Sequence, residues 1–153
     1  MSRQICMSKP TIIAIDHDDY HASHVGRLSD GRQFFLTEPF VPAVQGNAGR
    51  EFVALYIFDK RGSLLDALID DLGTRAELDI ESAGRVIEQR LADLGPVEYG
   101  RIEIQPFEIQ RFGTTFGLLM RPPEEGDDDW WVELQPGNYM AFHEPWDSGE
   151  YDT

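Results

Sequence analysis

The stretch Glu51-Phe52-Val53-Ala54-Leu55-Tyr56-Ile57-Phe58 is apolar at every position after its first residue. Successive side chains of a β-strand point to opposite faces of the sheet, so a strand here would have two apolar faces. The two sets would be Phe52, Ala54, Tyr56 and Phe58 on one face, and Val53, Leu55 and Ile57 on the other. Such a strand is covered on both sides. We therefore expect a central strand at 51–58, with other elements packed above and below it.

Turn signals on both sides of this stretch indicate antiparallel neighbours. Ser29-Asp30-Gly31-Arg32 separates strands expected at 24–28 and 33–37. Asp-Gly between such runs is a strong hairpin signal, because both central positions of the turn favour positive φ. A second turn at 59–62 precedes residues 63–70, whose leucines would also fit a helix. The turn chemistry favours a strand there.

Shorter apolar runs predict the remaining strands. In 102–110 the apolar positions change parity across Pro106, so one continuous strand would need a bulge near Gln105-Pro106. The other strands are expected at 11–16, 115–121, 130–134 and 139–143.

Residues 79–94 carry the signals of an amphipathic helix. Asp79 can accept hydrogen bonds from the free amides of the first turn, and Gly95-Pro96 ends the helix. Apolar residues recur at helical spacing and form one stripe. The stripe consists of Ile80, Ala83, Val86, Ile87, Leu91 and Leu94.

Together these elements predict an α+β fold. It would hold a largely antiparallel sheet of about eight or nine strands in hairpins, with the helix at 79–94 packed on one face. A chain of 153 residues fits a single domain, 1–153. We expect flexible tails at 1–10 and 147–153, unless Trp146 or Tyr151 anchors the second one.

The sequence predicts a cytoplasmic protein. The one cysteine, Cys6, cannot form an internal disulfide, and the first residues lack the pattern of a secretory signal. Apolar runs are too short to span a membrane. We expect no membrane association.

The charge is strongly negative: 28 acidic residues against 13 basic ones give a net charge of −15. Such a field repels nucleic acid and anionic membranes and attracts cationic partners. Beyond Arg121 the chain has no Lys or Arg, and acidic residues gather at 124–129 and 144–152. We expect no nucleic-acid binding.

These charges favour a protein-binding module, of an inhibitor or immunity type, that recognises a basic partner. The residues expected at the interface are Asp127, Asp128, Asp129, Trp131 and Trp146. The alternative interpretation is an acidic surface that only keeps the protein in solution.

A second hypothesis comes from the histidine cluster at 17–24. Imidazole and carboxylate groups bind zinc, manganese and iron, and His17, Asp19 and His21 would point the same way on an extended chain. His24 could add a fourth ligand after a turn. This hypothesis makes the chain a metal-dependent enzyme or metal-binding protein with a divalent cation, and the sequence implies no other cofactor. The alternative is a polar connection whose histidines are solvated.

A third hypothesis is a site for a sugar or small ligand built from aromatic residues in 130–146. Trp and Tyr are favoured as binding anchors, although large aromatics are mostly buried in cores. The candidate lining is Trp130, Trp131, Tyr139, Phe142, His143 and Trp146. Neither a Gly-x-Ser-x-Gly elbow nor a phosphate-binding glycine loop occurs in the sequence. We therefore assign no catalytic residue and leave enzyme activity open.

Overall fold

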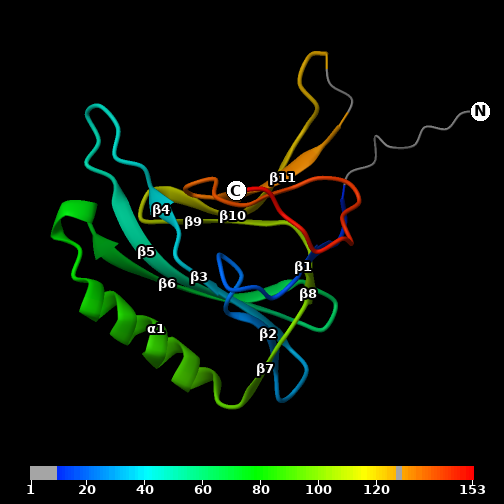
Figure 1. Cartoon of the computed structure of the whole chain (residues 1–153), viewed down its shortest axis with the longest axis horizontal. Coiled ribbons are helices and arrows are strands. Elements are labelled where there is room, and N and C mark those ends of the chain that lie inside the picture. Colours follow the sequence, from blue (N-terminus) through cyan, green and yellow to red (C-terminus); the bar gives the residue numbers. More distant parts are fainter. Residues whose placement is uncertain (1–9, 127–128) are drawn as a thin grey trace, which may run out of the picture.

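The computed structural model describes residues 10–126 and 129–153. In this part of the chain, twelve strands form three antiparallel sheets, and one α-helix covers the largest of them (Figure 1). The predicted α+β fold with mostly antiparallel pairing is confirmed. The expectation of one sheet of eight or nine strands is wrong, because the strands divide into sheets of six, four and two.

The six-stranded sheet is organised around β5 (Arg50–Phe58), which pairs with β3, β4 and β6. Beyond β3 the sheet continues through β2 to β7. The predicted central strand and the strand predicted at 63–70 are confirmed. The other members are β2 (Val25–Leu28), β3 (Gln33–Thr37), β4 (Phe40–Val41), β6 (Leu64–Gly73) and β7 (Val97–Tyr99).

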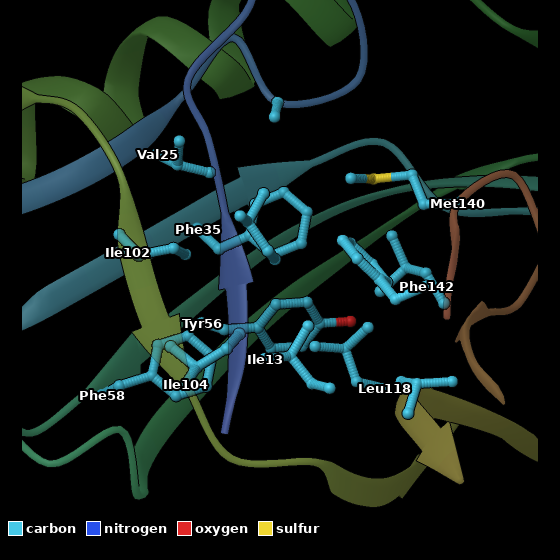
Figure 2. Packing of buried hydrophobic residues seen from close by; sticks show 14 of the residues in the cluster. Ile13, Val25, Phe35, Tyr56, Phe58, Ile102, Ile104, Leu118, Met140 and Phe142 are labelled. Carbon is cyan, nitrogen blue, oxygen red and sulfur yellow. The ribbon is translucent and has the colours of Figure 1, made fainter. Parts of the chain in front are cut away.

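The two faces of β5 enter two different hydrophobic clusters. Ala54, Tyr56 and Phe58 join the larger cluster, which lies between the sheets (Figure 2). Val53, Leu55 and Ile57 join a second cluster on the helix side. This is the alternation expected from the sequence, and it explains why the strand has no polar face.

The four-stranded sheet has the order β12-β11-β10-β9, and β1 pairs with β8 in the two-stranded sheet. The run at 102–110 is therefore not one bulged strand. It breaks at Gln105-Pro106, where the chain passes from β8 in one sheet to β9 in another. The bounds are β1 (Ile13–Ile15), β8 (Ile102–Ile104), β9 (Phe107–Arg111), β10 (Thr114–Arg121), β11 (Trp131–Gln135) and β12 (Ala141–Phe142).

The helix α1 (Ile80–Leu94) begins after Asp79, whose side chain accepts a 3.1 Å hydrogen bond from the Glu81 amide. Val86, Ile87, Leu91 and Leu94 pack against the second cluster, as the apolar stripe predicted. Ile80 belongs to the same stripe but is 79% exposed. A short 3-10 helix, η1 (Arg75–Glu77), precedes α1. No helix in residues 10–126 or 129–153 is long and apolar enough to cross a membrane.

The hairpin predicted around Asp30-Gly31 is confirmed, since β2 and β3 pair on either side of it. Its turn differs from the expected one. Gly31 has a φ of 92°, but Asp30 does not take positive φ. The Gly31 amide bonds to the Leu28 carbonyl at 3.0 Å, so a single positive-φ residue closes this loop.

The segment after β12 is bound to the rest of the molecule. The Ala14 amide donates to the Trp146 carbonyl at 2.9 Å, and the Asp16 amide donates to the Gly149 carbonyl at 3.1 Å. Tyr151 packs against the larger cluster. These contacts support the alternative in which 147–153 is anchored and is not a flexible tail. The other expected tail, 1–10, lies outside the described residues except for Pro10, which is buried.

Candidate functional site

The histidine cluster lies in a compact turn built by Asp18. Its Oδ1 accepts hydrogen bonds from the Tyr20 amide at 2.7 Å and the Ala22 amide at 3.1 Å. Its own amide donates to the Ala22 carbonyl at 3.1 Å. The chain is therefore not extended here, and the condition under which His17, Asp19 and His21 would point the same way is not met.

Tyr151 holds this turn from the other end of the sequence. Its hydroxyl donates to Asp18 Oδ2 at 2.6 Å and accepts from the His21 amide at 3.2 Å. Partial burial alone would raise the pKa of Asp18, but the bonds from Tyr151, Tyr20 and Ala22 outweigh it and lower that pKa from 3.8. Burial and the bond to Asp18 raise the pKa of Tyr151 to about 12.

Because of this turn, the side chains of the histidine cluster lie in different surroundings. His17 is exposed and its Nε2 donates to the Ser23 carbonyl at 3.1 Å, while Asp19 is exposed. His21 stacks on Tyr20 with ring centroids 3.9 Å apart, and its ring meets the edge of Tyr139 at 4.8 Å. The cluster and one of the C-terminal aromatics therefore meet in space.

His21 and His24 line a small pocket with Thr37, Glu38 and Tyr139, which we call the polar pocket. It has a volume of about 50 Å³, and Tyr20, Ser23, Leu36 and Ile87 complete its wall. Four separate parts of the chain build it: the turn at 16–24, the end of β3, helix α1 and the connection from β11 to β12.

The deep side of the polar pocket is a buried hydroxyl pair. The Thr37 and Tyr139 hydroxyls lie 2.7 Å apart, and burial raises the pKa of Tyr139 well above 10.0. Within the described part of the chain, the Nδ1 atom of His24 is buried without a hydrogen-bond partner. One residue of the pocket wall, His24, therefore carries a buried ring nitrogen that no described residue pairs, while the Thr37 and Tyr139 hydroxyls pair with each other.

Both pocket histidines favour the neutral form. Burial lowers the pKa of His21 and of His24 from 6.5. The negative charges of Asp18 and Glu38 at His21, and of Glu38 at His24, offset this only in part. Neutral imidazole offers one donor and one acceptor nitrogen, so these rings can serve as hydrogen-bond acceptors at neutral pH.

A wider, open depression lies beside the same turn. It is lined by Asp16, Asp18, Tyr20, Glu150 and Tyr151, has a volume of about 400 Å³, and is named here the acidic hollow. A second depression, which holds Glu144 and Asp152, shares Glu150 and Tyr151 with it. Tyr20 lines both the acidic hollow and the polar pocket, so the two sites are neighbours.

Acidic groups outnumber basic ones around the hollow. Asp16 lies 3.5 Å from an Arg101 nitrogen, and His143 lies 3.5 Å from Asp152. Among the residues that the structure describes, Glu144 and Glu150 form no ion pair with a basic side chain. The surface keeps negative charge that a cationic partner could neutralise.

None of the interface residues expected from sequence lines the hollow, and two of them cannot be placed. Asp127 and Asp128 lie outside the described residues, and Asp129 is exposed. Trp131 is half-buried on β11 and its indole nitrogen donates to Glu133 at 3.0 Å. Trp146 packs against the larger core cluster.

The other two hypotheses gain no site from the described residues. Within 10–126 and 129–153, no three His, Cys, Asp or Glu side chains are grouped to hold a metal ion, so a metal role for His17, Asp19, His21 and His24 stays a prediction. In the aromatic set, Tyr139 and Phe142 are buried. That burial fits core packing better than a sugar-binding surface.

Sequence reasoning missed Thr37, Glu38 and the partnership of Tyr151 with Asp18, while Glu150 lies in the acidic run noted at 144–152. An Asp side chain often accepts a hydrogen bond from the backbone amide two residues later and so forms a turn. Asp18 could therefore have indicated that 16–24 is a turn and not an extended segment. Nothing local links Glu38 to the histidines.

Comparison with known proteins gives no further guide. No protein-family model matches the chain, and neither the curated proteins nor the solved structures contain a match.

Proposed function

We propose that this chain is a cytoplasmic protein-binding module of inhibitor or immunity type, and that it recognises a basic partner through the acidic hollow. The observation that carries the proposal is the arrangement of Asp16, Asp18 and Glu150 around a depression beside the exposed ring of Tyr20. A concave, negatively charged surface with an aromatic rim suits lysine and arginine side chains.

The overall charge supports the same interpretation. A net charge of −15 attracts a cationic protein before contact, and it raises the rate of association. Salt screens this attraction over a distance of about 8 Å at physiological ionic strength. Binding should therefore weaken as salt rises, mainly through a slower association rate.

Tyr20 supplies the apolar part of the contact. Its side chain is 64% exposed, although it stacks on His21. Aromatic anchors dominate the binding energy of many interfaces, and a cation over an aromatic face is worth about 0.5–1 kcal/mol at exposed sites. A basic segment lying in the hollow would bring its cations to this ring.

The test compares two placements of the interface at equal change in net charge. One variant carries Glu144→Lys and Glu150→Lys beside the hollow. The other carries Asp128→Lys and Asp129→Lys in the acidic loop named from sequence. Both are titrated by calorimetry with a ten-residue peptide of alternating arginine and glycine, at low and at physiological salt.

We expect the hollow variant to bind at least about tenfold more weakly and the loop variant to lose less than about threefold, because close charges matter more than distant ones. Equal losses would mean that the peptide responds to net charge alone, and this would remove the hollow as the interface. A chain that does not bind the peptide even at low salt would refute the basic-partner proposal.

A further inference from the structure

Two residues of the polar pocket carry polar groups that no described residue pairs. Glu38 lies at the pocket and forms no hydrogen bond or ion pair through its carboxylate with any described residue. The buried Nδ1 of His24 is likewise without a partner. A buried polar atom without a partner costs free energy, so a ligand that donates hydrogen bonds here would gain by relieving that cost.

The charges of the pocket residues favour a positively charged ligand. Glu38 brings a carboxylate, while burial lowers the pKa of both pocket histidines and disfavours their cationic forms. A second anion would meet repulsion from Glu38 and from the acidic hollow. A cation with several N–H donors can pair with the Glu38 carboxylate and with the acceptor nitrogens of the neutral imidazole rings.

The size of the pocket and the aromatic rings on its wall favour one kind of cation. A volume of about 50 Å³ holds a group of about three or four water-sized atoms, which matches the four non-hydrogen atoms of a guanidinium. A guanidinium is flat, carries five donors, pairs with carboxylates and stacks on aromatic rings. The Tyr20 and His21 rings form a stacked pair on the pocket wall, with an interplanar angle of 28°.

We infer that the polar pocket receives the guanidinium of an arginine side chain of the partner, with Glu38 as its ion-pairing group and His24 as a hydrogen-bond acceptor. This rests on the proposed function, because the arginine belongs to the basic partner. Tyr20 borders both sites, so an arginine in the pocket would place its neighbours over the acidic hollow. The pocket would give specificity to a surface that otherwise attracts any cation.

The test uses three small probes that differ in one group: N-acetyl-arginine amide, N-acetyl-lysine amide and N-acetyl-citrulline amide. Citrulline matches arginine in shape but carries no charge. The readout is the ¹⁵N chemical shifts of the histidine ring nitrogens, which report a new hydrogen bond at the His24 ring. We expect saturable shifts at His24 with the arginine probe at millimolar concentration, and much smaller ones with the other two probes.

A pair of exposed carboxylates provides the matched variants. Glu38→Gln should weaken the arginine probe about tenfold, because it removes the charged partner of a paired guanidinium. Glu125→Gln removes the same charge at an exposed position that lines neither the pocket nor the hollow, and it should leave the affinity within about twofold. Both residues are exposed, so neither change should prevent folding.

Equal shifts with arginine and citrulline, or equal affinity for lysine, would overturn the inference. So would an arginine probe that leaves His24 unchanged. If the arginine-glycine peptide still binds in a manner that depends on Glu144 and Glu150, the proposed function stands and the pocket inference alone fails. If neither the peptide nor the arginine probe binds, both fail together.

Discussion

The hydroxyl of Tyr151 donates a 2.6 Å hydrogen bond to Asp18, a residue 133 positions earlier in the chain. Asp18 in turn fixes the backbone of the histidine turn through the Tyr20 and Ala22 amides. One contact thus joins the wall of the polar pocket to the rim of the acidic hollow. Both proposed sites depend on the C-terminal segment being in place.

Replacing Tyr151 with phenylalanine should destabilise the protein, because the hydrogen bond to a charged carboxylate is lost. We expect a decrease of about 1–2 kcal/mol in the free energy of unfolding, measured by urea denaturation. Tyr20→Phe is the matched control, since the exposed Tyr20 hydroxyl bonds to no residue within 10–126 or 129–153, and it should stay within about 0.5 kcal/mol of the parent. Equal effects of the two changes would show that the Tyr151–Asp18 bond does not stabilise the fold.

Acid should weaken the fold through the pocket histidines. The folded-state pKa values of His21 and His24 lie below 6.5, so the unfolded chain binds protons at these positions more readily. Their contribution to stability is complete above pH 6.5 and is lost as the pH falls through the folded-state values. Urea denaturation should give a lower free energy of unfolding at pH 5.5 than at pH 7.5.

The double variant His21→Gln/His24→Gln isolates this contribution, because glutamine does not titrate. Its stability should change less between pH 7.5 and 5.5 than that of the parent. The pKa of Asp18 lies below 3.8, so this carboxyl stays ionised throughout this range. A variant that keeps the full slope of the parent would assign the acid sensitivity to other groups.

Two buried tyrosines should respond in opposite directions to loss of the hydroxyl. Tyr56 is fully buried between the sheets, and its hydroxyl has no hydrogen-bond partner among the described residues (Figure 2). Tyr56→Phe should therefore leave stability unchanged or raise it by up to about 1 kcal/mol. Tyr139→Phe leaves the Thr37 hydroxyl unpaired and should cost about 1–3 kcal/mol. Thermal and urea unfolding of both variants would check this, and a loss at Tyr56 would reveal a partner for its hydroxyl.

The sequence predicted those elements whose signals are local. The apolar run of β5 indicated two covered faces, and both are covered. The N-terminal Asp79 and the apolar stripe after it indicated α1. The pattern could not show that Ile80, the first residue of that stripe, lies outside the second hydrophobic cluster and is exposed. Periodicity tells which residues share a face, but it does not tell how far the neighbouring sheet extends.

The division into three sheets and the two sites could not be predicted in this way. The break at Gln105-Pro106 looks the same in sequence whether the chain bulges within a strand or passes to another sheet. The polar pocket depends on the Thr37–Tyr139 pair, whose members are 102 positions apart. Such contacts form only after tertiary packing, and no spacing rule in one sequence records them.

Gly149 allows the C-terminal segment to approach the histidine turn. It has a φ of 80°, and a Cβ atom at this position would overlap the carboxylate of Asp16. Gly149→Ala should therefore strain the backbone and also force Asp16 to rotate away from Arg101, which lies 3.5 Å from it. Gly46→Ala is the matched control: its φ is 78°, but no atom lies within 4 Å of the added Cβ.

We expect Gly46→Ala to cost about 1 kcal/mol through backbone strain alone, and Gly149→Ala to cost about 1 kcal/mol more. Because Asp16 lines the acidic hollow, Gly149→Ala should also weaken the arginine-glycine peptide, whereas Gly46→Ala should not. Urea denaturation and calorimetry on the same two variants separate these effects. If both variants bind the peptide like the parent, the position of Asp16 does not matter for binding, and the hollow must work through Glu150 and its neighbours.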